Sequence, residues 1–193
     1  MQFETFHIKG PMRVTPKVFA DARGYFSETF VEAAFLKGLC REGLGEVRFV
    51  QDNESLSHAA GTVRGLHYQA PPRAQGKLVR CARGAVVDVA VDVRTGSPTY
   101  GEHIRVELSA TNAHQLWIPE GFLHGFATQV PDTIVAYKVT DTYAPECDGS
   151  VAFDDPDLDI DWGVDTARAV LSDKDRTAPR FADWTSPFRW VGD

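Results

Sequence analysis

The stretch from Val86 to Arg94 constrains the fold of this chain more than any other, because valine recurs at every second position. One side of the stretch carries Val87, Val89, Val91 and Val93, and the other carries Asp88, Ala90 and Asp92. A period of two is typical of a β-strand, whose successive side chains point to opposite faces. The turn-rich sequence RTGSPTYG follows, and EHIRVELS then predicts a strand that returns alongside the first.

Four further segments predict strands, each bounded by turn residues: KLVRCA, HQLWIP, HGFATQ and IVAYKVTDTYA. A helix is expected in FVEAAFLKGLC, residues 30–40, and two short helical turns are expected near the C-terminus. Short strands at this density indicate a sandwich or jelly roll rather than β-α-β units. The 193 residues contain no repeat or linker, so a single all-β domain over residues 1–193, with a few peripheral helices, is predicted.

The net charge of −7 argues against a nucleic-acid partner, because such binding depends on Lys and Arg side chains that neutralise phosphates. A small anion would need a local cluster of basic residues. No signal peptide or membrane span is recognisable, so a cytoplasmic protein without membrane contact is expected. The widely spaced Cys40, Cys81 and Cys147 predict free thiols.

Two of the six histidines stand in surroundings that favour burial. His67 in RGLHYQ and His124 in PEGFLHGF lie between glycines and apolar residues. The other four are expected at the surface: His7, His58, His103 and His114. A buried imidazole needs a hydrogen-bond partner, and that requirement often marks a functional site. A histidine satisfied within the core is the alternative reading of either position.

Two separated histidines in a β-rich chain invite comparison with metal-binding cupins, whose first motif places His-x-His and Glu after a glycine. The spacing from Gly61 to His67 fits that motif, and PEGFLH is similar to the second. The remaining ligands are missing, because Gln69 stands two residues after His67 and Lys77 stands where a carboxylate is wanted. Two histidines beside a lysine make a poor divalent-metal site, so the sequence predicts a site without metal.

His, Lys, Arg and Tyr side chains on a barrel wall can perform acid–base chemistry without a metal. A neutral His is a general base if a carboxylate orients its far nitrogen. Lys or Arg stabilises a developing oxyanion, and Tyr can return a proton. Together these groups suit proton abstraction from carbon next to a ketone. A nucleophilic hydrolase is disfavoured, because the chain has no G-x-S-x-G motif and no cysteine beside a candidate base.

Six segments occur in this order along the chain: FADARGYFSETF, FVQDNESLS, GTVRGLHYQ, QGKLVRCARGAVVDVAVDVRTGSPTYG, LWIPEGFLHGF and LSDKD. In content and order they resemble the dTDP-4-dehydrorhamnose 3,5-epimerase family, over about residues 3–179. The resemblance implies a cupin-like antiparallel jelly-roll barrel that forms a homodimer, with a C-terminal tail at about 180–193 outside the similarity. It also implies epimerisation at C3 and C5 of dTDP-4-dehydro-6-deoxyglucose, beside the C4 ketone and without a cofactor, in dTDP-L-rhamnose biosynthesis.

The resemblance assigns His67 as the base, Asp175 as its carboxylate partner and Tyr137 as the acid that reprotonates from the opposite face. The residues expected to line the sugar site are Lys77, His124 and Arg64, with Lys77 suited to the enolate oxygen. From the residues alone, Asp175 would be a surface carboxylate, Tyr137 a core residue and Lys77 an edge charge. His67 is therefore the one catalytic residue that the sequence selects unaided.

The resemblance also assigns substrate-contacting positions toward the nucleotide: Arg23, Glu28, Gln51, Asp52, Asn53, Asp148 and Lys174. Tyr143 matches a ring that stacks on thymine, and Arg side chains suit diphosphate oxygens. From the sequence alone Arg23 would be a solvated turn residue. The chain departs from the family pattern at Glu54, where many relatives have His, and at Asp148, where Glu is usual. The shorter Asp148 is expected to weaken nucleotide selectivity slightly.

Three alternative functions remain open at this point. An epimerase that acts at one carbon only is the nearest, a metal-dependent cupin oxygenase or isomerase belongs to another class, and a silent sugar-nucleotide binding module is the third. The candidates for base, acid and oxyanion stabiliser favour the 3,5-epimerase. The sequence does not give the order of the two epimerisations, nor which polysaccharide or glycoside uses the product.

The spacing of Arg64 and His67 is irregular for one strand. Residues three apart lie on opposite faces of a regular strand, yet both are expected in the site. Gly65 between them can mark a bulge that re-aims one side chain. Alternatively, Arg64 precedes the regular part of the strand.

Overall fold

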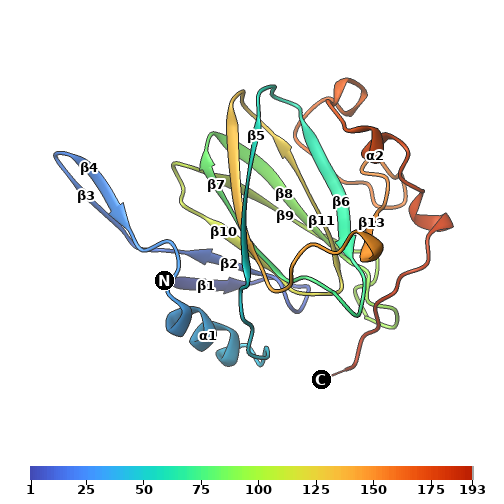
Figure 1. Ribbon diagram of the computed structural model, residues 1–193, viewed down its shortest axis with the longest axis horizontal. Helices are drawn as coiled ribbons and strands as arrows, with labels where there is room; N and C mark the ends of the chain where they lie inside the picture. Colours follow the sequence, from blue (N-terminus) through green and yellow to red (C-terminus); the bar gives the residue numbers. More distant parts are fainter. Residues whose placement is uncertain (193) are drawn as a thin grey trace.

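The computed structural model describes residues 1–192, which form two large sheets packed face to face (Figure 1). One sheet has six strands, in the spatial order β1 (Gln2–Thr5), β2 (Met12–Thr15), β10 (Gln115–Ile118), β7 (Lys77–Arg83), β12 (Thr133–Val139) and β5 (Gln51–Ser57). The other has five, in the order β13 (Asp148–Ser150), β6 (Val63–Gln69), β11 (Phe122–Thr128), β8 (Ala85–Asp92) and β9 (His103–Ser109). Neighbouring strands are antiparallel throughout both sheets.

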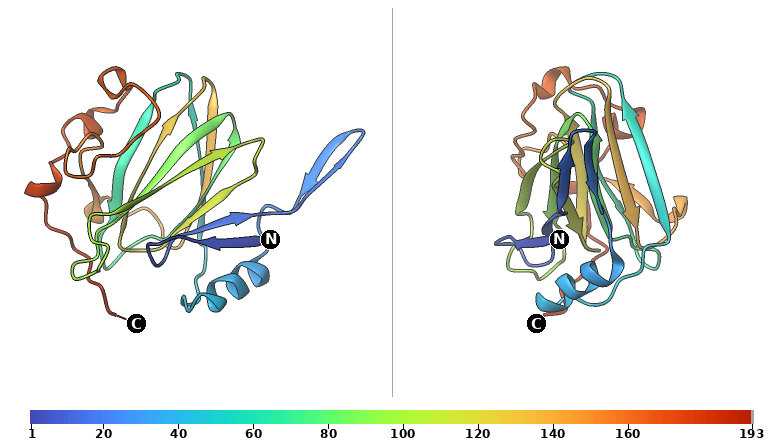
Figure 2. Two further views of the ribbon diagram at one scale, coloured as in Figure 1. Left: turned by 180° about the vertical axis from the view of Figure 1, so that it is seen from behind. Right: turned by 90° about the vertical axis from the view of Figure 1, so that its left-hand side faces the viewer.

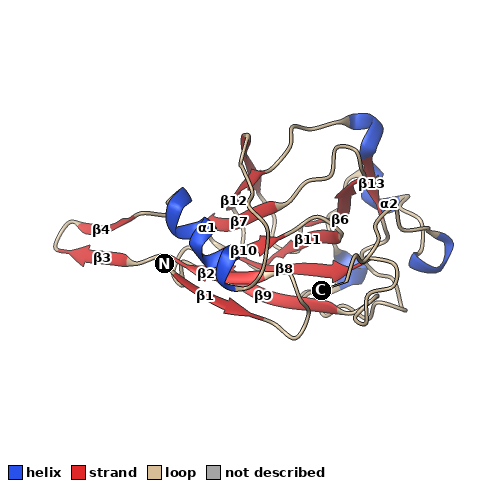
Figure 3. Cartoon of the chain, turned by 90° about the horizontal axis from the view of Figure 1, so that it is seen from below, coloured by secondary structure: helices blue, strands red, loops and turns tan. Residues whose placement is uncertain are grey.

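The remaining elements lie at the periphery of these two layers (Figure 2). Strands β3 (Val18–Asp21) and β4 (Gly24–Ser27) form a separate hairpin that extends away from the body of the molecule (Figure 3). The helical elements are α1 (Glu32–Arg41), η1 (Pro145–Cys147), η2 (Thr166–Arg168), α2 (Asp173–Arg176) and η3 (Phe181–Asp183). The predicted all-β jelly-roll class, with a few short peripheral helices, is confirmed.

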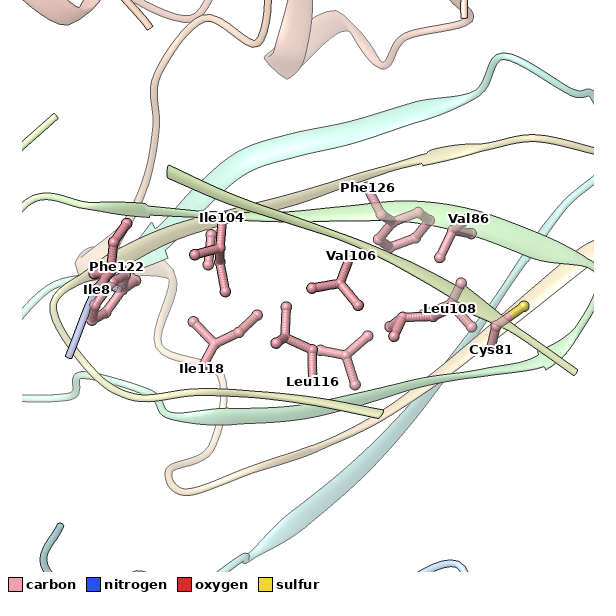
Figure 4. Close-up of a cluster of buried hydrophobic side chains, with 13 residues drawn as sticks. Ile8, Cys81, Val86, Ile104, Val106, Leu108, Leu116, Ile118, Phe122 and Phe126 are labelled. Atoms are coloured by element: carbon pink, nitrogen blue, oxygen red, sulfur yellow. The ribbon is translucent and has the colours of Figure 1, made fainter. Parts of the chain in front are cut away.

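The main core lies between the two sheets (Figure 4). Val79 and Leu116 of the six-stranded sheet belong to the same buried cluster as Val106, Leu108 and Phe126 of the five-stranded sheet. Burying each such side chain contributes about 2 kcal/mol relative to leaving it in water. This apolar cluster adjoins the polar residues described below, because Tyr137 packs against it and Phe126 belongs to both.

Strand β8 has the predicted alternation of side chains, and both of its faces are buried. Its valine face, from Val87 to Val93, packs against the C-terminal segment, including Phe153, Trp162 and Phe188. Its other face points into the barrel. Asp88 therefore lies with no exposed surface inside the protein, which is costly for a carboxylate unless it finds a partner.

Two predicted boundaries need correction. The strand predicted through Ala144 ends at Val139, because the following backbone leaves the sheet and bonds to side chains instead. Gln75 and Gln69 donate hydrogen bonds to the carbonyls of Asp141 and Thr142. The helix predicted over residues 30–40 is present as α1, shifted to Glu32–Arg41, and packs Phe35 against the edge of Trp117.

Strand β6 contains a bulge at Gly65. This is the first of the two interpretations that the spacing of Arg64 and His67 allowed. His67 pairs with His124 and Arg64 with Phe126, so three steps along β6 match two steps along β11. Arg64 lies within the strand, which makes the alternative placement before the strand wrong. The bulge brings Arg64 and His67 to the same side of the sheet.

The C-terminal residues from about 180 to 189 pack on the barrel. Phe188 is buried in the cluster beneath β8, Phe181 and Trp184 pack beside it, and Arg189 forms a parallel bridge with Thr95. The predicted single domain over 1–193 includes residue 193, which lies outside the described residues. Cys40, Cys81 and Cys147 are free thiols. Over residues 1–192, no helix combines the length and apolar character that crossing a membrane requires.

Replacing Gly65 by alanine is predicted to destabilise the protein and disrupt the bulge. Gly65 has φ of 132°, and an added Cβ would lie 2.6 Å from Gly125 Cα and 2.8 Å from the His124 carbonyl oxygen. We expect Gly65→Ala to lower the free energy of unfolding by about 3 kcal/mol in urea titrations. Gly45→Ala is the control, because a Cβ there meets nothing within 4 Å. Equal stabilities of the two variants would contradict the assigned strain.

Candidate active site

A cavity of about 440 Å³ opens beside the polar part of the barrel. Its walls come from β5, β6, β7, β11 and β12, and the segment 170–175 closes one side. The residues that line it are Ser55, Thr62, Val63, Arg64, His67, Lys77, His124, Phe126, Tyr137, Val170, Leu171, Ser172 and Asp175. The volume suits one small ring and its substituents. All six residues assigned to catalysis or to the sugar site line this one cavity.

His67 and Asp175 form a hydrogen-bonded pair at the cavity wall. Nε2 of His67 lies 2.5 Å from Oδ1 of Asp175, which is buried. An ionised carboxylate at Nε2 fixes the ring in the tautomer that protonates this nitrogen. The lone pair is then on Nδ1, so His67 is arranged as a base rather than as a hydrogen-bond donor to the cavity.

The short helix α2 places Asp175. Ser172 caps its N-terminus, donating from Oγ to Oδ2 of Asp175 at 2.8 Å and accepting from the Asp175 amide at 3.2 Å. Burial alone would raise the pKa of Asp175, but the hydrogen bonds from His67 and Ser172 and the nearby positive charges outweigh it and lower the pKa. Asp175 therefore stays ionised at neutral pH and can stabilise a protonated His67.

The second histidine has its own buried carboxylate. Nε2 of His124 lies 3.0 and 3.1 Å from the two carboxylate oxygens of Asp88. Burial lowers the pKa of His124, and the Asp88 charge opposes that effect only in part, so the ring is neutral near pH 7. His124 lies opposite His67 in the pairing of β11 with β6, so the two imidazoles share one stretch of the wall.

Lys77 brings a positive charge into the cavity at the start of β7. Loss of hydration lowers its pKa to about 8, and the charges of Asp148 and Asp88 counteract part of this shift. Lys77 is thus mainly protonated at neutral pH, yet poorly solvated. An ammonium in such surroundings interacts strongly with an oxyanion.

Tyr137 and Arg64 complete the polar wall. Burial raises the pKa of the Tyr137 phenol, and the charge of Arg64 offsets part of that rise, so the hydroxyl keeps its proton at neutral pH. Arg64 is held from behind by Ser57 Oγ and the Leu56 carbonyl, at 3.3 and 3.2 Å. The cavity therefore combines a base, a proton donor and two cations, the set needed to form and reprotonate an enolate.

Part of the assigned nucleotide set gathers beside this cavity. The Tyr143 hydroxyl donates to Oδ2 of Asp148 at 3.1 Å, and Nζ of Lys174 also contacts that oxygen. Gln51 accepts from the Tyr143 amide at 3.4 Å and donates to Asn53 at 2.8 Å. Lys174 precedes Asp175, so this polar group adjoins the pair of His67 and Asp175.

Three assigned residues lie away from the cavity within this chain. Asp52 alternates with Gln51 and Asn53 on β5, so it points to the outer face, where it pairs with Lys138 at 2.7 Å. Arg23 is at the tip of the projecting β3–β4 hairpin and pairs with Asp21, and Glu28 is exposed just after β4.

Among the four histidines expected at the surface, His7 and His58 are exposed and lie near carboxylates. His103 and His114 are half-buried, so that expectation was wrong for them. His103 begins strand β9, and burial lowers the pKa of its imidazole.

Sequence reasoning missed two residues that organise the site, Asp88 and Ser172. Asp88 interrupts a valine-rich strand, and a carboxylate flanked by buried positions is itself a signal that a partner exists. Ser172 precedes Asp175 by three residues, the spacing of an N-cap serine and its acidic partner. Both patterns are visible in the sequence, but neither shows which histidine the carboxylate binds.

Within residues 1–192 no group of three or more His, Cys, Asp or Glu side chains is close enough to hold a metal ion. Gln69, which takes the place of the second histidine of the cupin motif, bonds to backbone groups instead.

Comparison with known proteins gives one consistent family. The family model described as dTDP-4-dehydrorhamnose 3,5-epimerase matches residues 5–183. The protein of that name from Sinorhizobium fredii is 50% identical over 191 residues, covering 99% of this chain and 95% of that protein.

Solved structures agree with this family. The epimerase of Elizabethkingia anophelis has a TM-score of 0.88 at 43% identity, covering 96% of this chain and 99% of that one. The dTDP-6-deoxy-D-glucose-3,5-epimerase of Legionella pneumophila, solved with dTDP-4-keto-L-rhamnose, has a TM-score of 0.85 at 42% identity. That match covers 93% of this chain and 92% of that one.

The pKa of Lys77 is predicted to depend on Asp88. The Asp88 charge favours the ammonium, so Asp88→Asn should move the pKa of Lys77 below about 8. NMR titration of lysine labelled at Cε measures this directly. Asp173→Asn removes one exposed acidic charge and serves as the control. An unchanged Lys77 titration in Asp88→Asn would contradict the coupling.

Proposed function

The chain belongs to the dTDP-4-dehydrorhamnose 3,5-epimerase family, and we propose that His67 and Asp175 are the proton-abstracting pair of that family's reaction. The activity is epimerisation of dTDP-4-dehydro-6-deoxy-D-glucose to dTDP-4-dehydro-L-rhamnose, in dTDP-L-rhamnose biosynthesis. The observation that carries the proposal is the 2.5 Å contact of His67 with Asp175 in a cavity that also holds Lys77 and Tyr137.

The C4 ketone of the substrate acidifies the hydrogens on both neighbouring carbons. His67 takes the proton from one of these carbons, the C–H electron pair forms the enolate double bond, and the charge moves to the C4 oxygen. Lys77 stabilises that oxygen, and Asp175 stabilises the imidazolium. Tyr137 then donates its proton to the opposite face of the carbon, which inverts it and restores the ketone. Once His67 has released its proton to solvent and Tyr137 has regained one, the same groups act at the second of the two carbons, C3 or C5.

We assign the nucleotide to the polar residues beside the cavity. In this proposal the ring of Tyr143 stacks on thymine, while Lys174, Gln51 and Asn53 contact the nucleotide and Asp148 orients Tyr143 and Lys174. Arg64 and His124 bind the sugar. Because a charged nucleotide sugar does not cross membranes unaided, we also place the reaction in the cytoplasm.

Proton exchange with solvent tests the proposed roles. In heavy water, NMR should show deuterium at both C3 and C5 of the sugar, with a 4-ketoreductase coupled to draw the equilibrium forward. His67→Ala is expected to lose at least about a thousandfold of this exchange, because the base is removed. Asp175→Asn should lose less, since the imidazole remains. Tyr137→Phe should impair reprotonation.

The outcomes discriminate between the remaining functions. Exchange at a single carbon would identify a single-centre epimerase, and exchange at neither, together with tight dTDP binding, would identify a binding module. Exchange that persists in His67→Ala would remove His67 from its role. Activity lost to chelators, with stoichiometric metal in the purified protein, would replace the mechanism with a metal-dependent one.

We further propose that the active unit is a homodimer in which the β3–β4 hairpin reaches the partner's site. The hairpin projects from the body and exposes apolar side chains: Val18, Phe19, Tyr25 and Phe26. Such a surface is unfavourable in water and suits a protein contact. It would also explain how Arg23 and Glu28, remote from the cavity of their own chain, contact substrate.

Mixed dimers test this arrangement. Arg23→Ala and His67→Ala chains, each inactive alone, are denatured together and refolded. If Arg23 acts in the partner's site, half of the dimers contain one intact site, so about a quarter of the wild-type activity should return. If Arg23 acts in its own chain, none returns. A monomer by light scattering would contradict the dimer outright.

A further inference from the structure

We propose that Gln69 is a positioning residue for nucleotide binding, because it fixes the backbone on both sides of Tyr143. The inference rests on the proposed role of Tyr143. Gln69 lies two residues after His67 on β6, and strand alternation turns both side chains to the same face. It is 4% exposed, so its amide is removed from water and must be satisfied by the protein.

Every polar atom of the Gln69 side chain bonds to backbone rather than to another side chain. Its Nε2 donates to the Thr142 carbonyl at 3.1 Å and to the Arg73 carbonyl. Its Oε1 accepts from the Ala144 amide at 2.9 Å. Thr142 and Ala144 are the neighbours of Tyr143, so one side chain ties both peptide groups that flank it.

The bonds from Gln69 matter to Tyr143 because this residue makes few contacts of its own, although Arg73 also braces Asp141 and the Thr142 hydroxyl before it. Tyr143 is 59% exposed, and strand β12 has already ended at Val139. Its own contacts are the hydroxyl bond to Asp148 and the 3.4 Å bond from its amide to Gln51. An exposed aromatic ring binds a planar base best when its backbone is already ordered, since the ordering cost is then not part of binding.

The chemistry of the side chain explains why glutamine suits this position. The Thr142 carbonyl needs a donor and the Ala144 amide needs an acceptor, and a carboxamide supplies both on one rigid group. Glutamate keeps the shape and the acceptor but loses the donors. Methionine keeps similar volume and loses both. Gln69 thus links the strand of the proposed base to the loop of the proposed nucleotide contact.

The test compares Gln69→Met with Gln75→Met. Gln75 also donates its amide to a backbone carbonyl of this loop, that of Asp141 at 2.7 Å, which lies two residues before Tyr143 rather than next to it. We expect Gln69→Met to weaken dTDP binding in calorimetry and raise KM, each by about tenfold. The kcat should stay within about twofold, because the cavity groups are untouched. Gln75→Met should bind dTDP like the wild type.

Hydrogen exchange of the Ala144 amide measures directly whether its hydrogen bond to Gln69 is present. NMR of the free protein should show faster exchange of this amide in Gln69→Met than in the wild type and in Gln75→Met. If Gln69→Met does not fold, Gln69→Glu carries the same comparison, since it preserves volume and the acceptor. Unchanged dTDP affinity in the folded variant, or a loss of kcat at constant KM, would overturn the proposal.

Tyr143→Ala separates the two levels of inference. If it does not weaken dTDP binding, the nucleotide role of Tyr143 is wrong and this proposal falls with it. If Tyr143→Ala weakens binding while Gln69→Met does not, the assignment of Gln69 alone is overturned. Weakening by both, with faster Ala144 exchange in Gln69→Met, supports both.

Discussion

The packing of the C-terminal segment on the outer face of the five-stranded sheet is the constraint on which the site depends. Residues such as Phe153 and Trp162 cover the valine face of β8, so this strand is buried on both faces. The same segment joins β6 through backbone hydrogen bonds between Val170 and both Val63 and Gly61, at 3.0 and 2.9 Å. The chain reaches α2 directly afterward. Apolar packing on the outer face of this sheet therefore positions Asp175 at the cavity, where it bonds to His67.

Around the cavity, basic side chains are combined with two buried carboxylates, Asp88 and Asp175. The protein is acidic overall, yet its cavity holds Lys77 and Arg64 beside two histidines. Each histidine has a buried carboxylate, so neither Asp88 nor Asp175 lacks a partner. The environments differ, because His67 lies partly open to the cavity and His124 is buried. The two pairs therefore differ in their access to the cavity, and burial lowers the pKa of His124.

The sequence by itself determined the features that depend on local geometry. Alternation identified β8, because side chains in a strand point to opposite faces whatever surrounds them. Gly65 between Arg64 and His67 made a bulge one of two possible interpretations, and the register of β6 against β11 then decided for it. His67 and His124 were identified as candidates because a polar ring among apolar neighbours needs a partner. The motif order then identified the family over nearly the whole chain.

Only the tertiary structure decided which groups meet. Asp175 lies 108 residues beyond His67, and Asp88 lies 36 residues before His124. A local sequence pattern therefore cannot predict either pairing. Strand pairing placed Asp52 on the outer face, and the free hairpin carried Arg23 away from its own cavity. The physical reason is that periodicity fixes the direction of a side chain relative to its own strand. Its partner depends on which strands and segments pack beside it, which is settled by burial over the whole barrel.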